Sequence, residues 1–238
     1  MSSTETLSLD RSWPTPPGLA VRGTVAVLPG RGEQAGVYER FGTRIAADSY
    51  AVHALAATSL QELTAAVTAL AADGPSPLVL VGSDTGALRA LALAALLDRR
   101  VDALVLAGVP SDSGFAGGWV DELDARTACP VHRGRLESEL ARGQLDNVPG
   151  ALLVAAASAR PAVPTLVLHG AADTVAPVEG ARALANRLPH ARLVTVLDGR
   201  HDVLNDLSHR SVAAEIVQFL ERLRTPDWSR PILRVEVA

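Results

Sequence analysis

Three segments of the chain place reactive side chains just beyond short apolar stretches. Asp84 stands between Gly82 and Gly86, with one residue separating it from each glycine. Glycines at these positions permit a strand-to-helix turn so sharp that the central side chain projects above a sheet. Asp173 and His201 follow the apolar stretches TLVLHG and LVTVL. A candidate nucleophile, an acid and a histidine in that order can support nucleophilic or general-base catalysis.

These residues can act together only if the fold brings them to one place. Short β-branched stretches alternate with longer stretches rich in alanine and leucine, which is typical of a parallel sheet with helices on both faces. The carboxyl ends of parallel strands share one edge of the sheet, so residues that follow different strands can meet there. The expected strands cover residues 24–28, 51–55, 78–81, 103–107, 165–169 and 193–197. The expected helices cover residues 37–47, 60–72, 86–97, 177–188 and 211–224.

The same pattern predicts the division of the chain. A single α/β core is expected over residues 19–108 and 164–226. Residues 1–18 are polar and broken by prolines, and they are expected to form an N-terminal strap or a mobile tail. Residues 109–163 lack a strand-helix alternation and are polar, so they are expected to form an inserted lid. Residues 227–238 are expected to be a C-terminal tail.

Composition narrows the chemistry and the partners. The 238 residues are 48% hydrophobic and 20% charged, which is enough apolar surface for one compact domain. The net charge of −4, with both signs interspersed, argues against a nucleic-acid partner. All 22 basic residues are arginine, which excludes lysine chemistry, and a single cysteine cannot form an internal disulfide or a cysteine zinc cluster. We expect a small-molecule substrate, no metal and no organic cofactor.

The location of the protein is also an expectation from sequence. The N-terminus lacks the basic start and apolar core of a secretion signal, which predicts a cytoplasmic protein. No apolar run approaches the roughly 18–20 residues that a membrane span requires. The oligomeric state is left open.

Three longer motifs resemble one family. The segments are LPGRGEQAGVYERFGTRIA, which resembles an HGxGEHSxxYxxxA stretch, TLVLHGAADTVAP, which resembles an acid loop, and DGRHDVLND, which resembles a histidine loop. Over residues 23–223 the chain resembles an α/β-hydrolase of the monoacylglycerol lipase and lysophospholipase-like group. The resemblance implies that Asp173 is the triad acid and His201 the triad base. It also implies an oxyanion hole formed by the backbone N–H groups of Arg31 and Thr85.

The chain departs from this family at the positions of the expected oxyanion hole and nucleophile. Pro29 replaces the usual histidine before Gly30, Arg31 replaces a small residue, and Asp84 replaces the nucleophilic serine. An aspartate that attacked an ordinary ester would form an adduct that expels carboxylate rather than alkoxide. The carboxylate is the better leaving group by roughly 12 pKa units, or on the order of 16 kcal/mol as an upper bound. Simple acyl transfer is therefore disfavoured.

Attack by Asp84 on a saturated carbon fits the aspartate better. Displacement at an epoxide, at the alkyl carbon of a lactone or at a carbon–halogen bond gives an alkyl ester, which water activated by His201 can hydrolyse. The first hypothesis is thus a hydrolase of small organic electrophiles with an Asp-His-Asp triad. The alternatives are a non-hydrolytic lyase or cyclase with Asp84 or His201 as general base, a ligand-binding member of the fold, and a lipase or esterase with an altered nucleophile.

Several further residues are candidates for substrate contact. Gly30 and Ser83 flank the expected oxyanion region, and Phe115 and Trp119 fall in the expected lid, where they line a substrate channel or form a small core. Arg31 either binds a substrate anion or is a solvated loop residue.

For four other polar residues, the sequence favours a structural role over a catalytic or metal-binding one. Cys129 and His132, three residues apart, lack the further ligands that a structural zinc site requires. Asp202 and Asp206 are interpreted as caps of the helix after the histidine loop, because Asp173 already fits the position of the acid.

Overall fold

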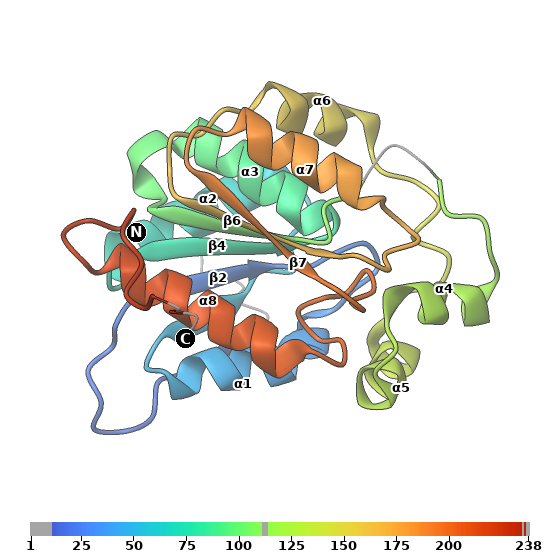
Figure 1. Cartoon of the computed structure of the whole chain (residues 1–238), viewed down its shortest axis with the longest axis horizontal. Helices are drawn as coiled ribbons and strands as arrows, with labels where there is room; N and C mark the ends of the chain where they lie inside the picture. Colours follow the sequence, from blue (N-terminus) through green and yellow to red (C-terminus); the bar gives the residue numbers. More distant parts are fainter. Residues whose placement is uncertain (1–10, 111–113, 235, 237–238) are drawn as a thin grey trace, which may run out of the picture.

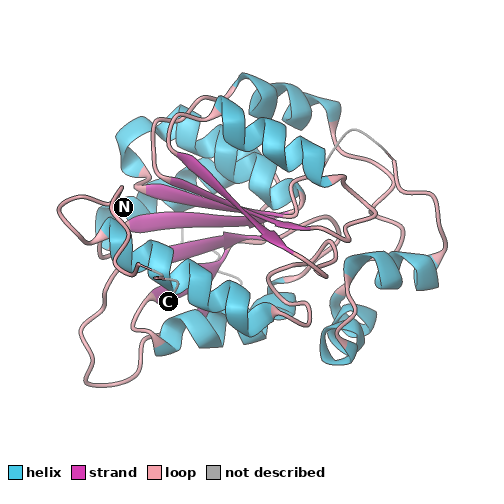
Figure 2. Cartoon of the chain, in the orientation of Figure 1, coloured by secondary structure: helices cyan, strands magenta, loops and turns pink. Residues whose placement is uncertain are grey.

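The computed structural model describes residues 11–110, 114–234 and 236. Within them, seven strands form one sheet in the order β1-β3-β2-β4-β5-β6-β7, and only β1 is antiparallel to its neighbour (Figures 1 and 2). The predicted α/β fold with a mostly parallel sheet is confirmed. The strands are β1 (Arg11–Trp13), β2 (Thr24–Leu28), β3 (Ala51–Ala54), β4 (Leu78–Ser83), β5 (Ala103–Ala107), β6 (Thr165–Gly170) and β7 (Ala191–Val196).

Helices cover both faces of the sheet (Figure 1). On one face lie α1 (Glu39–Ala47) and α8 (His209–Leu223). The opposite face is covered by α2 (Leu60–Asp73), α3 (Thr85–Leu97), α6 (Gly150–Ser158) and α7 (Val178–Arg187). The remaining helices are α4 (Trp119–Arg126), α5 (Pro130–Glu139) and the short 3-10 turns η1 (Ala35–Tyr38) and η2 (Asp98–Arg100).

The central strands are apolar along their length because both of their faces are buried. In β4, Val79 and Val81 pack into the core beneath α1 and α8, whereas Leu78 and Leu80 pack into the core beneath α2 and α3. This alternation explains the continuous hydrophobic stretches in the sequence. It also fixes the strand register, since a shift by one residue would exchange the two faces.

The end of the expected N-terminal strap is part of the sheet. Arg11–Trp13 forms the edge strand β1, antiparallel to β3, which no sequence pattern had indicated. Trp13 is buried against Gly42 of α1, where an added Cβ would lie 2.3 Å from the indole. The first ten residues of the expected strap lie outside the described part of the chain.

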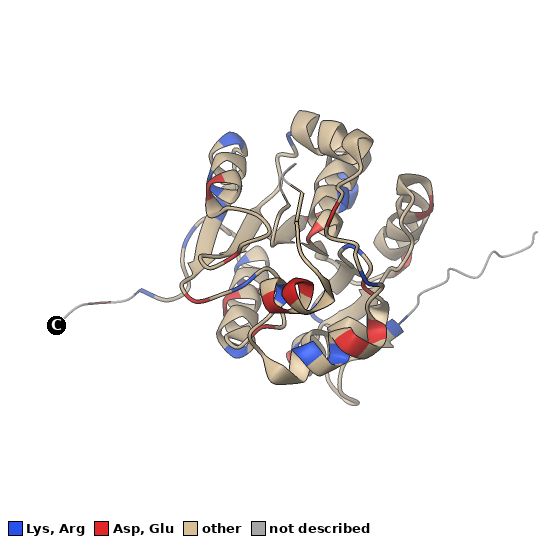
Figure 3. Cartoon of the chain, turned by 90° about the vertical axis from the view of Figure 1, so that its right-hand side faces the viewer, with Lys and Arg blue, Asp and Glu red and all other residues tan. Residues whose placement is uncertain are grey.

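The expected lid contains three helices. Its helix α6 packs against α3 and so belongs to the helical layer of the core. Helices α4 and α5 lie beyond the carboxyl end of the sheet, and Figure 3 views their face, which carries charges of both signs. The polar sequence of this region is not all surface, because Glu122 and Arg126 are buried.

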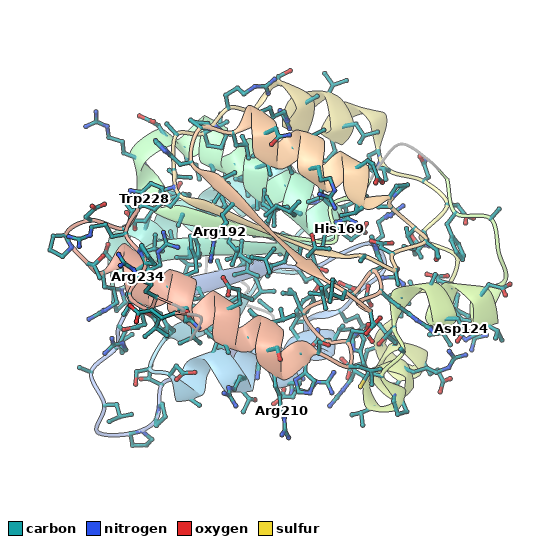
Figure 4. All side chains as sticks on the ribbon, in the orientation of Figure 1. Asp124, His169, Arg192, Arg210, Trp228 and Arg234 are labelled. Carbon is teal, nitrogen blue, oxygen red and sulfur yellow. The ribbon has the colours of Figure 1, made fainter. Side chains whose placement is uncertain are left out.

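The C-terminal segment after α8 lies back on the domain. Arg222 of α8 donates a hydrogen bond to the carbonyl of Trp228, whose ring meets His190 edge-on at 5.4 Å between centroids (Figure 4). Among the described helices, none combines the length and apolar character needed to cross a bilayer.

Candidate active site

Asp84 occupies a strained turn between β4 and α3. Its φ of +50° and ψ of −123° lie in a region that L residues rarely adopt. The turn is possible because the chain carries glycine on both sides. A Cβ on Gly86 would lie 2.0 Å from the carbonyl oxygen of Leu28, and one on Gly82 would lie 2.3 Å from the carbonyl oxygen of Gly86. The two glycines therefore set the position of Asp84 above the sheet.

The structure brings together the three residues that the sequence motifs singled out. His201, which follows β7, places Nδ1 2.8 Å from Asp173 Oδ2 and Nε2 3.3 Å from Asp84 Oδ1. Asp173 follows β6, and its other oxygen accepts hydrogen bonds from the amides of Val175 and Ala176. All three functional side chains are buried. Residues separated by up to 117 positions thus form one hydrogen-bonded cluster.

Arg31 covers the carboxylate of Asp84. Its backbone N–H donates to Oδ2 at 2.8 Å, and its Nε lies 2.8 Å from the same oxygen. A guanidinium nitrogen lies 2.7 Å from Oδ1. Another guanidinium nitrogen donates to the carbonyl of Leu145, at 2.8 Å. Arg31 is therefore neither a solvated loop residue nor a free anion site, because its charge already pairs with Asp84.

The imidazole ring of His201 lies between the carboxylates of Asp84 and Asp173. Burial by itself would lower the pKa of His201, but Asp173 and Asp84 outweigh it and raise the pKa to about 10. Burial would raise the pKa of Asp84, yet His201 and Arg31 hold it well below its usual range. The pKa of Asp173 is likewise held low against burial, by His201 and by His169. The geometry therefore favours an imidazolium and two carboxylates at neutral pH.

Comparison with solved structures shows the same architecture over most of the chain. The monoacylglycerol lipase of Paleococcus ferrophilus matches with a TM-score of 0.72 and 18% identity, over 90% of this chain and 98% of the lipase. A soluble variant of the monoglyceride lipase from Saccharomyces cerevisiae matches with a TM-score of 0.72 and 15% identity, over 89% and 90% of the two chains. The chain has the α/β-hydrolase fold.

Two further comparisons agree with the α/β-hydrolase fold. A serine hydrolase involved in carbazole degradation matches with a TM-score of 0.63 and 19% identity, over 85% of this chain and 92% of that one. The model of an abhydrolase family described as TAP-like protein matches residues 145–230, which include Asp173 and His201. No curated protein matches the chain at a significant level.

A buried ionic network supports the loop of the α/β-hydrolase fold that carries Arg31. Glu33 accepts a hydrogen bond from the Gly30 amide at 2.7 Å and another from the hydroxyl of Tyr38. Arg126 of α4 reaches Glu33 at 3.3 Å and donates to the carbonyl of Arg31 at 2.9 Å. These contacts fix the loop from both sides. The sequence signal for Glu33 was its place in the HGxGEHS-like motif, whereas Arg126 was hidden in a stretch interpreted as polar lid.

The histidine loop is tied to α4 and α5 by two aspartates. The prediction that Asp202 and Asp206 cap the following helix is wrong, because Ser208 precedes α8 and neither carboxylate bonds to its first turn. Instead, Asp202 lies 3.1 Å from Nε2 of the buried His132. Asp206 accepts hydrogen bonds from the Thr127 hydroxyl at 2.8 Å and from neighbouring amides. Both side chains connect the histidine loop to α5 and to the residues just before it, rather than to α8.

The remaining candidates around Asp84 are Gly30, Ser83 and Thr85. Gly30 is so close that an added Cβ would lie 2.9 Å from the Asp84 Cβ, and Ser83 is the buried last residue of β4. Thr85 is buried as the first residue of α3, and its hydroxyl accepts a hydrogen bond from Arg89. No hydrogen bond joins Thr85 to Asp84 among the described contacts, so its oxyanion role stays a prediction.

The two aromatic candidates lie farther out. Trp119 packs against the main core and stacks with the Arg142 guanidinium, 4.9 Å from the ring centroid. Phe115 packs in a small apolar cluster and lines a surface cavity of about 520 Å³ with Thr174 and Arg200, which adjoin Asp173 and His201 in sequence. This cavity is a candidate approach to the cluster.

Access to Asp84 is closed in this conformation. The exposed fractions of Asp84, His201 and Arg31 are 0%, 1% and 8%. A substrate can therefore reach the carboxylate only if the Arg31 side chain moves. In the described part of the chain, no group of three or more histidine, cysteine, aspartate or glutamate side chains is arranged to hold a metal ion.

Proposed function

We propose that the protein is a hydrolase in which Asp84 attacks a compact organic electrophile of the epoxide, lactone or related ester type. The family model and the lipase and hydrolase structures support a hydrolase of the α/β-hydrolase superfamily. The geometry of Asp84 supports the more specific assignment. In this proposal Asp84 is the nucleophile, His201 donates and accepts protons, and Asp173 orients the imidazole of His201.

The observation that carries the proposal is that the two carboxylate oxygens of Asp84 face different partners. Oδ1 faces His201 Nε2, and Oδ2 accepts the backbone N–H of Arg31 at 2.8 Å. When an alkyl ester on Oδ1 is hydrolysed, the oxyanion forms on Oδ2, which belongs to the aspartate itself. A donor already aimed at that oxygen would stabilise the tetrahedral intermediate. A serine enzyme, by contrast, needs the donor to face an oxygen of the substrate.

The first step moves negative charge away from Asp84. A lone pair on Oδ1 forms a bond to the substrate carbon, the bond between that carbon and its leaving oxygen breaks, and the leaving oxygen keeps the electron pair. The Arg31 guanidinium, having lost its carboxylate partner, can then pair with that oxygen. His201 also loses one of the two carboxylates that raise its pKa. Its proton passes to the leaving oxygen, which gives a neutral imidazole.

The second step returns the site to its starting state. Water adds its oxygen to Cγ of the Asp84 ester while the neutral His201 takes a proton from it. The tetrahedral intermediate expels the product alkoxide, which takes that proton back. The carboxylic acid left on Asp84 gives its proton to His201, and this restores the imidazolium and the carboxylate. One water is consumed for each substrate opened.

Isotope labelling tests the covalent step. A single turnover in heavy-oxygen water, on a panel of small epoxides and lactones, should leave heavy oxygen in the peptide that contains Asp84. On a lactone, whose leaving carboxylate needs no proton from His201, His201→Gln should accumulate an alkyl-enzyme adduct that is visible by intact mass. Turnover that leaves Asp84 unlabelled would eliminate this mechanism in favour of general-base chemistry.

One observation favours a second candidate, a ligand-binding or non-hydrolytic member of the fold. The resting carboxylate is fully buried and paired with Arg31, which makes it a weak nucleophile. Under this alternative, no electrophile in the panel is consumed and Asp84→Ala retains ligand binding. The altered-lipase hypothesis predicts instead that Asp84→Ser cleaves a short p-nitrophenyl ester.

A further inference from the structure

A second pocket opens on the surface between α1, α5 and the first turn of α8. Its volume is about 390 Å³. Four arginines line it: Arg40, Arg44, Arg135 and Arg210. Figure 4 labels Arg210 below the start of α8, on the α1 side of the sheet. We call this site the basic pocket, and its lining does not include Asp84, Asp173 or His201.

The positive charge of the basic pocket is largely uncompensated. Arg135 forms an ion pair with Glu139. Arg44 and Arg210 have no carboxylate partner among the described residues, and Arg40 donates to the thiol of Cys129 and to a backbone carbonyl. Within the described part of the chain, three guanidinium groups are thus left without an acidic partner.

Glu39 does not neutralise the excess positive charge of the basic pocket. It is the one carboxylate in the wall of the pocket, and it pairs with Arg11, which lies outside that wall. The local excess of positive charge therefore remains that of Arg40, Arg44 and Arg210. A cavity with such an excess favours an anion.

The positions of His209 and Asn205 show that these charges converge. Burial lowers the pKa of His209, and the nearby guanidinium groups of Arg40, Arg210 and Arg44 lower it further. Asn205 lines the pocket from a buried position, and its Oδ1 has no hydrogen-bond partner. The lowered pKa of His209 therefore shows that the cationic groups of the pocket lie close to one another.

We propose that the basic pocket binds a small phosphate monoester. A phosphate group carries close to two negative charges at neutral pH and matches the fork geometry of arginine. The wall of the pocket also includes apolar side chains, Val37, Ala47 and Val131, which suit an organic body attached to the phosphate. Three unpaired guanidinium groups exceed what one carboxylate would neutralise, so the phosphate class fits better than a simple carboxylate.

Calorimetry with phenyl phosphate, inorganic phosphate and benzoate at fixed ionic strength tests the proposal. The double variant R44Q/R210Q removes two exposed, unpaired arginines of the pocket. The matched control is R99Q/R100Q, which removes two exposed arginines of η2, away from the pocket. Thermal unfolding of each variant checks that it is folded.

The wild-type protein and the control should bind phenyl phosphate with equal affinity, and more tightly than inorganic phosphate. R44Q/R210Q should bind it at least tenfold more weakly. The proposal is overturned if the wild type binds neither phosphate, or if both double variants lose affinity equally, as they would for non-specific charge attraction. Benzoate binding as tight as that of phenyl phosphate would overturn the phosphate assignment in favour of a carboxylate.

Discussion

One oxygen of Asp84, Oδ1, lies 2.7 Å from a guanidinium nitrogen of Arg31 and 3.3 Å from Nε2 of His201. Both partners are cationic in the resting state, so the carboxylate is stabilised twice. Both oxygens of the Asp84 carboxylate are therefore already engaged by hydrogen-bond partners. Chemistry at Asp84 depends on releasing one of these contacts. Apart from Asp84, the Arg31 side chain is held by the carbonyl of Leu145, whereas His201 is held by Asp173.

Replacing Arg31 with methionine should separate the two stabilising contacts. The variant keeps the backbone N–H but removes the guanidinium, so the pKa of Asp84 should rise and the free energy of unfolding should fall by about 3 kcal/mol. Urea unfolding measures the loss. Adding Asp84→Asn to Arg31→Met should recover part of it, because the carboxylate left with one partner fewer is then neutral. Full additivity of the two substitutions would contradict a direct energetic coupling.

The raised pKa of His201 predicts a loss of stability at alkaline pH. The folded pKa of about 10 exceeds the value of about 6.5 in the unfolded chain. The stabilisation is therefore complete below about pH 6.5 and is lost as the pH rises toward 10. The free energy of unfolding should fall by a few kcal/mol between pH 7 and pH 9.5. His201→Gln should flatten this slope, and an equal slope in the variant would exclude His201 as its source.

Arg126 should be far more important for stability than its place in a polar stretch suggests. It is fully buried and lies near three buried carboxylates, those of Glu33, Glu122 and Asp202. Arg126→Met would leave these carboxylates without their shared cation, at a cost of about 3–5 kcal/mol in urea unfolding. Arg133→Met removes a part-exposed arginine of the neighbouring α5 and should cost less than about 1 kcal/mol. Equal effects would show that the buried network contributes nothing specific.

The sequence predicted the central strands and the meeting of Asp84, Asp173 and His201 because those features depend on local periodicity and on glycine spacing. Edge strand β1 was missed, since three residues beside a proline-rich segment carry no periodic signal. The pairing of Arg31 with Asp84 was also missed. It depends on a rotamer and on a carbonyl of Leu145 more than 110 residues away, which no local pattern encodes.

Composition was the poorest guide to burial in α4, within the stretch interpreted as a polar lid. Glu122 and Arg126 are charged residues, which are rarely buried unless they are paired, so a sequence rich in them is interpreted as surface. Their partner Glu33 is far away in sequence, and only the folded chain shows that Arg126 pairs with both Glu33 and Glu122. The same reasoning applies to Asp206, whose carboxylate accepts from the amides of Ala128 and Cys129 rather than from those of the following helix.

A last prediction concerns the glycine that lets α3 begin so close to β2. Gly86→Ala would place a methyl group 2.0 Å from the backbone carbonyl of Leu28, and backbone cannot move aside without shifting the strand. We expect a loss of at least about 3 kcal/mol in urea unfolding, or an insoluble protein. Gly180→Ala is the matched control in the exposed part of α7, where nothing lies within 4 Å of the added Cβ. That substitution should stabilise the protein by about 0.5–1 kcal/mol through helix propensity, so a similar effect at both glycines would contradict the tight elbow.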